Sequence, residues 1–131
     1  DVERSRGLGD VYKRQVKIKR VYETISEDDG VRVLVDRLWP RGISKEYAHI
    51  DKWLKDIAPT SQLRKWFNHD PEHFEEFSHR YVEELDSNHE AVGVIMDLFN
   101  KYQTITLLYA AKNPKVNHAL VLQEYLQKLL A

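Results

Sequence analysis

The stretch GVRVLVDRLWPRG, residues 30–42, decides the fold more than any other part of the sequence. Residues 31–35 are a nearly unbroken run of aliphatic side chains, most of them β-branched, which is typical of a buried strand. The chain then changes abruptly to an aspartate, two arginines and a tryptophan beside Pro40 and Gly42. Arginine and aspartate are seldom fully buried unless they are paired, so the stretch predicts a buried strand that ends in a polar surface loop.

Two other segments have strand patterns. Residues 16–23 alternate imperfectly between apolar and basic side chains, and the turn-forming residues 26–30 separate them from the strand at 31–35. Residues 104–111 become apolar on both faces toward their end, as a buried parallel strand does. The sequence therefore predicts a small sheet of about three strands.

The other patterned segments predict helices, because apolar residues recur in them at helical spacing. Most of them begin at a residue suited to capping. The predicted helices start at Ser44, at Thr60 or Ser61, at Asp70-Pro71, near Ala91 and at Asn117, and the first ends before Pro59. Strands and helices in this order predict a single α/β domain with a mainly parallel sheet flanked by helices.

Parallel pairing between the strands at 31–35 and 104–111 is the geometric basis of the functional prediction. The helical segment between them is long enough for a right-handed crossover. In that arrangement the loops at 36–42 and 112–118 leave the same edge of the sheet, where open α/β sheets bind their ligands. We therefore expect a site between these two loops.

Residues 1–15, DVERSRGLGDVYKRQ, differ from the rest of the chain. They carry no periodic apolar pattern and mix glycine with charge. We interpret them as a leader of translated vector or adapter sequence, with a disordered native tail as the alternative. Residues 16–131 are then the single domain.

Composition narrows the functional classes. The 131 residues include no cysteine, which excludes disulfides, thiolate catalysis and thiolate metal sites. The formal net charge of −1 argues against nucleic-acid binding by overall charge. No apolar run reaches the roughly 18 residues that a membrane span needs, and the sequence contains no signal-peptide core. We expect a cytoplasmic protein without a membrane partner.

The predicted edge of the sheet gathers positive charge. Arg37, Arg41 and Lys112 would lie beside the N-terminus of the helix that Asn117 caps, where backbone N–H groups and the helix dipole favour an anion. Arginine also suits bidentate recognition of phosphate or carboxylate. The alternative is structural: Arg37 would pair with Asp36 or with a helix carboxylate, and Arg41 would simply lie on the surface.

Two residues at this edge are candidates for catalysis. His118 lies at the start of the last helix, where the dipole favours a neutral imidazole that could act as a base or as a hydrogen-bond donor. Asp36 could orient this histidine or an arginine. The alternatives are a loop histidine bonded to a backbone carbonyl, and a strand-end aspartate that only caps nearby N–H groups.

Trp39 is the tryptophan best suited to stack on a ligand or base, because a proline and Arg41 follow it. His69 and His73 have the i, i+4 spacing of some zinc ligands, but Pro71 lies between them and no fourth ligand is visible. We therefore expect no metal and no cofactor. The sequence also lacks a glycine-rich phosphate loop and a nucleophile elbow.

Several motifs form a recognisable set that covers nearly all of residues 16–130. They are Val21-Tyr22, residues 29–42, Ala58-Pro59-Thr60, residues 63–67, Phe77, Arg80-Tyr81, Glu84-Leu85, residues 107–112 and Asn117-His118-Ala119. Together they resemble the YeaO-like family, which belongs to the grouping called domain of unknown function 488. The resemblance leaves out the leader, and it implies a small α/β protein of unestablished activity.

Larger relatives in that grouping end the last strand with a cysteine and a glutamate, and then have a Cys-His-Arg run. Here the corresponding residues are Tyr109, Ala111 and Asn117-His118-Ala119, so only the histidine persists. The resemblance therefore implies that thiol chemistry is lost in this chain. Any function would depend on the aspartate, the basic residues and the histidine named above.

The sequence leaves three functions open. The first is an anion-binding crevice for a small phosphorylated ligand or nucleotide, with hydrolase or transferase chemistry as an extension. The second is a nucleic-acid-binding module, with Trp39 stacking on bases and with Arg41, Lys45 and Lys115 on phosphates. The third is a protein-interaction domain without catalysis. Added salt should weaken the binding of a polyanion steeply, whereas it should weaken the binding of a small buried phosphate less.

Overall fold

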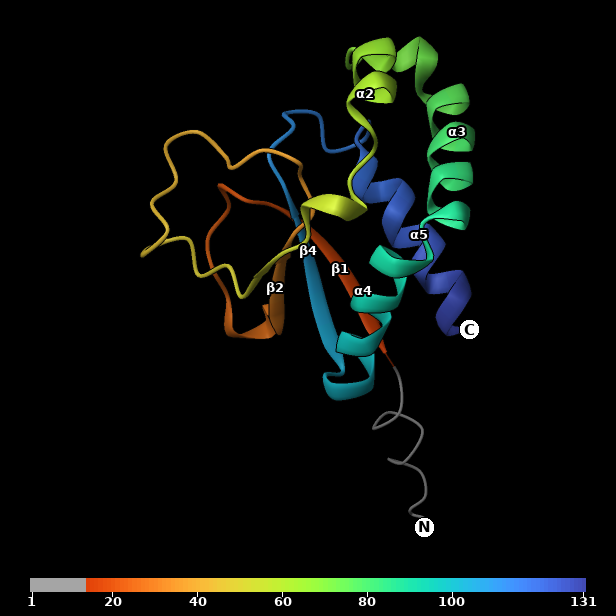
Figure 1. Cartoon of the computed structure of the whole chain (residues 1–131). Helices are drawn as coiled ribbons and strands as arrows, with labels where there is room; N and C mark the ends of the chain where they lie inside the picture. The colour runs from red at the N-terminus through yellow and green to blue at the C-terminus, as the bar shows by residue number, and fades with distance from the viewer. Residues whose placement is uncertain (1–13) are drawn as a thin grey trace.

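Four parallel strands in the order β1-β4-β2-β3 form the centre of the fold in the computed structural model, which describes residues 14–131 (Figure 1). The strands are β1 (Gln15–Arg20), β2 (Val31–Leu34), β3 (Lys52–Trp53) and β4 (Thr104–Tyr109). β4 lies between β1 and β2, and it pairs Ile105 with Val16 and Leu107 with Val33. The predicted α/β fold is therefore confirmed, and the short strand β3 is an addition.

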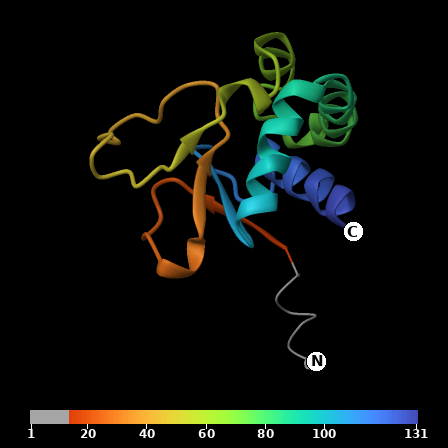
Figure 2. The same cartoon turned by 60° about the horizontal axis from the view of Figure 1, so that its bottom comes forward.

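Within the same range, the helices are α2 (Ser61–Phe67), α3 (Phe74–Ser87), α4 (His89–Lys101) and α5 (His118–Leu130), with short 3-10 turns η1 (Glu27–Asp29), η2 (Lys55–Ile57) and η3 (Pro71–His73). Helices α4 and α5 pack on one face of the sheet, α3 packs against these two helices and α2 against α3, and a long loop crosses the other face (Figures 1 and 2). The side chains of Thr60, Asp70 and Asn117 accept hydrogen bonds from backbone N–H groups of α2, η3 and α5. These three predicted helix starts are confirmed.

The helix predicted to start at Ser44 is wrong. Residues 35–51 form an irregular loop, which β3 and η2 follow. His49 in this loop has a φ of 49°, which an α-helix does not contain. Apolar side chains that suggested a helix, such as Ile50 and Trp53, instead pack against Leu34 on the face of the sheet that the α-helices leave open. Apolar residues at helical spacing therefore do not form a helix here; they belong to a loop that covers one face of the sheet.

Alternate residues of the strands face two cores of different size. Val33 and Leu107 belong to the large core under the helices, in which Tyr81 of α3 is 1% exposed. Leu34 and Leu108 belong to the small core under the loop. Because both faces of β2 and β4 are covered, their sequences are nearly continuous apolar runs.

The predicted leader lies outside the described residues except for its last two. Of these, Gln15 is the first residue of β1 and pairs with Thr104, so the first strand begins one residue before the predicted boundary. Among residues 14–131, no helix combines the length and the apolar composition needed to cross a membrane.

A buried polar cluster joins η1 to β1 and β2. The Asp29 carboxylate, which is 5% exposed, accepts hydrogen bonds from the Ser26 backbone N–H, from Lys19 Nζ and from the Arg32 guanidinium. Arg32 Nε also donates to the carbonyl oxygen of His49 at 2.9 Å, which anchors the long loop. Burial alone would raise the pKa of Asp29, but these hydrogen bonds outweigh burial and lower the pKa below its usual 3.8.

Gly30 lets the chain pass close to β4 at the start of β2. Its φ of 65° and ψ of −137° form a combination that other residues rarely adopt. A Cβ atom at this position would collide with the backbone carbonyl of Thr104. Gly93 in α4 differs, because no atom beyond its chain neighbours and the backbone of its own helix lies within 4 Å of the position that its Cβ would take.

We expect acid to destabilise the fold through Asp29. Its pKa is lower in the folded protein than in the unfolded chain, so its stabilising effect is full above about pH 4 and is lost as the pH falls through the folded-state pKa. Asp29→Asn should lower the free energy of unfolding near neutral pH by about 3 to 5 kcal/mol, the usual effect of breaking a buried ion pair. Urea unfolding should also show that the difference from wild type shrinks in acid. A constant difference would contradict this role.

The two glycines should respond to alanine in opposite directions. Gly30→Ala should destabilise the protein by about 1 to 3 kcal/mol or more, because the strained backbone and the contact with β4 cannot both be relieved. Gly93→Ala should stabilise it by about 0.5 to 1 kcal/mol, because alanine favours the helix. Thermal unfolding of the two variants measures both effects. The prediction would be wrong if both substitutions changed the stability in the same direction.

Candidate functional site

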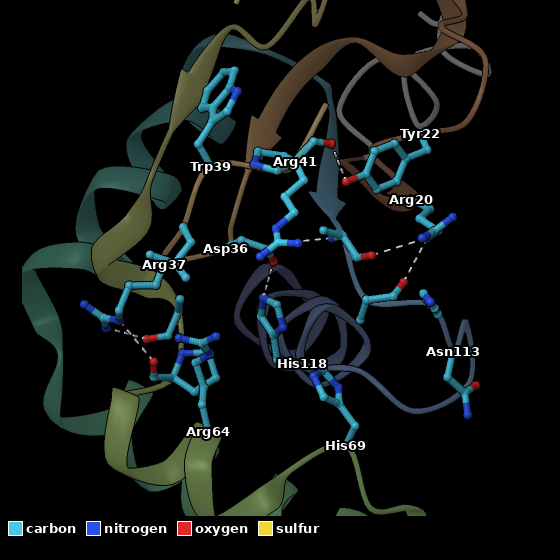
Figure 3. Close-up of a pocket in the computed structure, with 17 residues that line it drawn as sticks. Arg20, Tyr22, Asp36, Arg37, Trp39, Arg41, Arg64, His69, Asn113 and His118 are labelled. Carbon is cyan, nitrogen blue, oxygen red and sulfur yellow. Dashed lines mark hydrogen bonds and ion pairs between the residues drawn. The ribbon is translucent and has the colours of Figure 1, made fainter. Parts of the chain in front are cut away.

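The loops that follow β2 and β4 meet at one edge of the sheet, as predicted. The backbone N–H of Ala110 donates to Oδ2 of Asp36 at 2.9 Å and joins the two chain segments. A cleft of about 630 Å³ opens between the loops (Figure 3). This volume is within the range of about 300 to 1,000 Å³ that is typical of small-molecule sites.

Positive side chains dominate the charged lining of the cleft. Among the described residues that line it, Asp36 is the only acidic one. The basic residues and histidines of the lining are Arg20, Arg37, Arg41, Arg64, Lys112, His69 and His118. Most of the remaining lining is apolar.

Asp36 and His118 come together, as the sequence predicted, and their side chains are only 16% and 14% exposed. Nε2 of His118 lies 3.0 Å from the carbonyl oxygen of Val35 and 3.2 Å from Oδ1 of Asp36. A carbonyl oxygen only accepts hydrogen bonds, so Nε2 carries a proton and donates it to Val35. The buried Oδ1 of Asp36 has no hydrogen-bond partner within the described residues. This geometry matches the structural alternative for His118, a histidine bonded to a backbone carbonyl.

Two arginines are fixed to opposite walls of the cleft by backbone carbonyls (Figure 3). Arg37 donates from Nη2 and Nε to the carbonyl oxygens of residues 58 and 59, at 3.1 and 3.3 Å. Arg20 donates from Nε to those of residues 110 and 111, at 3.3 and 3.1 Å, and its guanidinium lies 4.7 Å from the centre of the Tyr22 ring. Within residues 14–131, Arg37 therefore pairs with neither Asp36 nor a helix carboxylate.

Arg41 and Lys112 are exposed and line the cleft from the two loops. The side chain of Arg41 extends across the cleft in the direction of Asp36 and His118 (Figure 3). Its backbone carbonyl accepts a hydrogen bond from the Tyr22 hydroxyl at 2.8 Å, which fixes this part of the loop. Neither basic side chain forms a hydrogen bond or ion pair with another described residue, so both are accessible to a ligand.

Trp39 and Asn117 are engaged mainly in structural contacts. The indole N–H of Trp39 donates to the carbonyl oxygen of Ile43 at 2.7 Å, and its ring meets that of Trp53 edge-on, although part of the side chain lines the cleft. Asn117 is 2% exposed and does not line the cleft. Its Oδ1 caps α5, and its Nδ2 donates to the carbonyl oxygen of Asn113 at 2.9 Å.

Sequence reasoning missed four polar residues of the lining: Arg20, Tyr22, Arg64 and His69. Arg20 and Tyr22 lie at and after the end of β1, whose parallel pairing with β4 puts them at the same edge of the sheet. Their position in the sequence therefore indicates that they lie at the cleft once the strand order is known. Arg64 and His69 reach the cleft only because α2 packs above it, and no pattern in the sequence encodes that contact.

His69 and His73 do not share a site. The ring of His73 stacks on Trp66 with the centroids 4.7 Å apart, whereas His69 has a φ of 55° and lines the cleft. Among residues 14–131, no group of three or more histidine, cysteine, aspartate or glutamate side chains could hold a metal ion.

The fold and the cleft together define a class of protein. It is a small α/β protein with a parallel sheet and a basic cleft at the carboxyl ends of the strands. An aspartate that follows β2 and a histidine that begins α5 meet in the cleft wall.

Comparison with known proteins identifies the family. A protein-family model described as the inactive DUF488-N3 subclade matches residues 15–131. The chain is 45% identical over 114 residues to the uncharacterized protein YeaO of Escherichia coli. This alignment covers 87% of the chain and 98% of YeaO. The chain is 42% identical over 116 residues to uncharacterized proteins of Mycobacterium bovis and Mycobacterium tuberculosis, covering 88% of this chain and 97% of each relative. No solved structure matches the chain. The chain belongs to the DUF488 family, in the subclade described as inactive.

We expect His118 to contribute to stability. Its removal would leave the buried carbonyl of Val35 without a donor, which typically costs about 1 to 3 kcal/mol. His118→Ala should lower the free energy of unfolding by this amount, and His118→Gln should recover part of it, because the amide can donate to the same carbonyl. His79→Ala, on the exposed side of α3, should change stability by less than about 0.5 kcal/mol. Urea unfolding that finds His118→Ala as stable as wild type would contradict this role.

Proposed function

We propose that the protein binds an anionic small molecule in the cleft, most simply one that carries a phosphate group. The observation that carries this proposal is the lining, where Asp36 is the acidic residue against five lysines and arginines. The whole chain has a formal net charge of −1, so the positive charge is a local concentration. A cleft lined by one sign of charge focuses the electric field and raises the local concentration of counter-ions.

The basic residues of the cleft are not neutralised by carboxylates of the protein. Elsewhere in the described residues, Arg32, Arg80 and Lys128 each form an ion pair with an aspartate or glutamate. No such pair involves the five basic residues of the cleft within the same part of the chain. The sequence has 21 acidic residues for 20 basic ones, so carboxylates are not scarce. Unpaired cations in a cleft support a site for an external anion.

Binding without turnover is the form of this function that the geometry supports best. The Nε2 proton of His118 is directed at Val35, and the carboxylate of Asp36 accepts the backbone N–H of Ala110. Both candidate catalytic residues therefore help to build the cleft wall. The description of the subclade as inactive agrees with this interpretation. Hydrolase or transferase chemistry is accordingly the second interpretation of the site.

A nucleic-acid-binding module has less support. That function needs Lys45 and Lys115 on one surface with Arg41, but neither lysine lines the cleft. It also needs a free face of Trp39, whose indole N–H is bonded to the carbonyl oxygen of Ile43, whose ring meets that of Trp53 edge-on, and whose ring centre lies 6.0 Å from Lys45 Nζ. A small ligand needs only the basic residues that already line the cleft.

Inorganic phosphate is the simplest probe of the proposed site. Arg41→Ala and Lys112→Ala should each weaken phosphate binding roughly tenfold, because each removes one charged contact worth about 1.5 kcal/mol. Both variants should fold normally, because neither side chain contacts another described residue by a hydrogen bond or ion pair. Chemical-shift titration by NMR measures the affinity and confirms the fold in one experiment.

Two lysines provide matched controls on the same loops. Lys45 and Lys115 are exposed cations that lie outside the cleft lining, so Lys45→Ala and Lys115→Ala should bind phosphate as the wild type does. Equal weakening in all four variants would indicate nonspecific attraction and would contradict a site in the cleft. A wild-type protein that shows no saturable shifts with phosphate would contradict the proposed function itself.

A further inference from the structure

Four of the five arginines and lysines that line the cleft belong to two opposite walls. Arg37 and Arg64 lie on one side, beside residues 58–59 and in α2 (Figure 3). Arg20 lies on the other side, at the end of β1, and Lys112 follows the neighbouring strand β4. The charge is therefore distributed between two ends of the cleft instead of a single centre.

Each wall holds one arginine in a fixed orientation. Arg37 is bonded through Nη2 and Nε to residues 58–59, and Arg20 is bonded through Nε to residues 110–111. Carbonyl partners orient a guanidinium without cancelling its charge, and a fixed side chain loses less entropy when a ligand binds. Each wall also has an exposed cation, Arg64 or Lys112, whose side chain has no hydrogen bond or ion pair to another described residue. Each wall can therefore receive its own anionic group.

The middle of the cleft has a different character. His118 and His69 lie between Arg64 on one side and Arg20 on the other, and Asp36 contacts His118 there (Figure 3). No arginine or lysine of the described lining, Arg41 included, forms an ion pair with Asp36. An anionic group at the centre would approach that carboxylate at close range, which is unfavourable. The electrostatics favour an uncharged segment in the middle and anionic groups at both ends.

We propose that the ligand carries two phosphate or carboxylate groups joined by an uncharged spacer, with one group at each wall. This inference rests on the proposed anion-binding function and names its ligand class. The volume of about 630 Å³ accommodates a molecule of the size of a nucleoside bisphosphate. Because the second group binds within the same molecule, its contribution depends on how well the spacer matches the distance between the walls.

A series of linear alkane bisphosphonates with spacers of increasing length tests the proposal, with methylphosphonate as the single-group reference. Wild-type affinity should pass through a maximum at one spacer length, roughly tenfold or more above methylphosphonate, and then decline. Arg64→Ala should remove this maximum and bring the best bisphosphonate close to methylphosphonate, whose own affinity should change less than about twofold. Lys65→Ala is the matched control, because Lys65 is the exposed neighbour of Arg64 in α2 and does not line the cleft. It should keep the maximum.

Three results would overturn the two-group ligand while leaving an anion site in place. They are a wild-type affinity that does not depend on spacer length, a maximum that survives Arg64→Ala, and an equal loss of methylphosphonate and bisphosphonate binding in that variant. Failure of the wild type to bind either methylphosphonate or inorganic phosphate would overturn the proposed function, and this inference with it.

Discussion

The position of Asp36 at the end of β2 is the constraint on which the rest of the site depends. Its carboxylate accepts the N–H of Ala110 after β4, its backbone carbonyl accepts the indole N–H of Trp53 in β3 at 2.8 Å, and His118 of α5 contacts its Oδ1. One residue thus connects the ends of three strands with the start of the last helix. A largely buried carboxylate needs such partners, because the loss of its hydration is costly. The same contacts hold the two loops in place around the cleft.

This arrangement also explains why the cleft stays positive. The carboxylate of Asp36 is directed to backbone and histidine partners, so it does not form an ion pair with Arg37, its neighbour in the chain. Arg37 and Arg20 are held by carbonyl oxygens, which carry only a partial negative charge. In the polar cluster of η1 the opposite occurs, because the carboxylate of Asp29 forms ion pairs with both Lys19 and Arg32. The carbonyl partners of Arg20 and Arg37 therefore orient these cations of the cleft without the full negative charge that Asp29 places beside Lys19 and Arg32.

The sequence predicted those parts of the structure whose local pattern of apolar and polar residues is compatible with only one conformation. The apolar runs of β2 and β4 require burial on both faces, and parallel pairing then places Asp36 near His118. The pattern at residues 44–57 was compatible with two conformations, because side chains such as Ile50 and Trp53 can face a core from a helix or from a loop. Arg64 could not be predicted as part of the cleft, because its place depends on how α2 packs and not on its neighbours in the chain.

The residues that stand where the resemblance gives the larger relatives reactive groups have structural roles in this chain. Tyr109, at the position of a cysteine in the resemblance, is 3% exposed, and burial raises the pKa of its hydroxyl, which therefore stays neutral in the core. Ala111, at the position of a glutamate, places no carboxylate in the cleft, and its carbonyl oxygen orients Arg20. Asn117 caps α5 where those relatives have a second cysteine. The neutral residues at these three positions place no thiol and no carboxylate beside the arginines and lysines of the described lining. Under the proposed function, the same neutral residues account both for the missing thiol groups and for the uncancelled positive charge that an anion would meet.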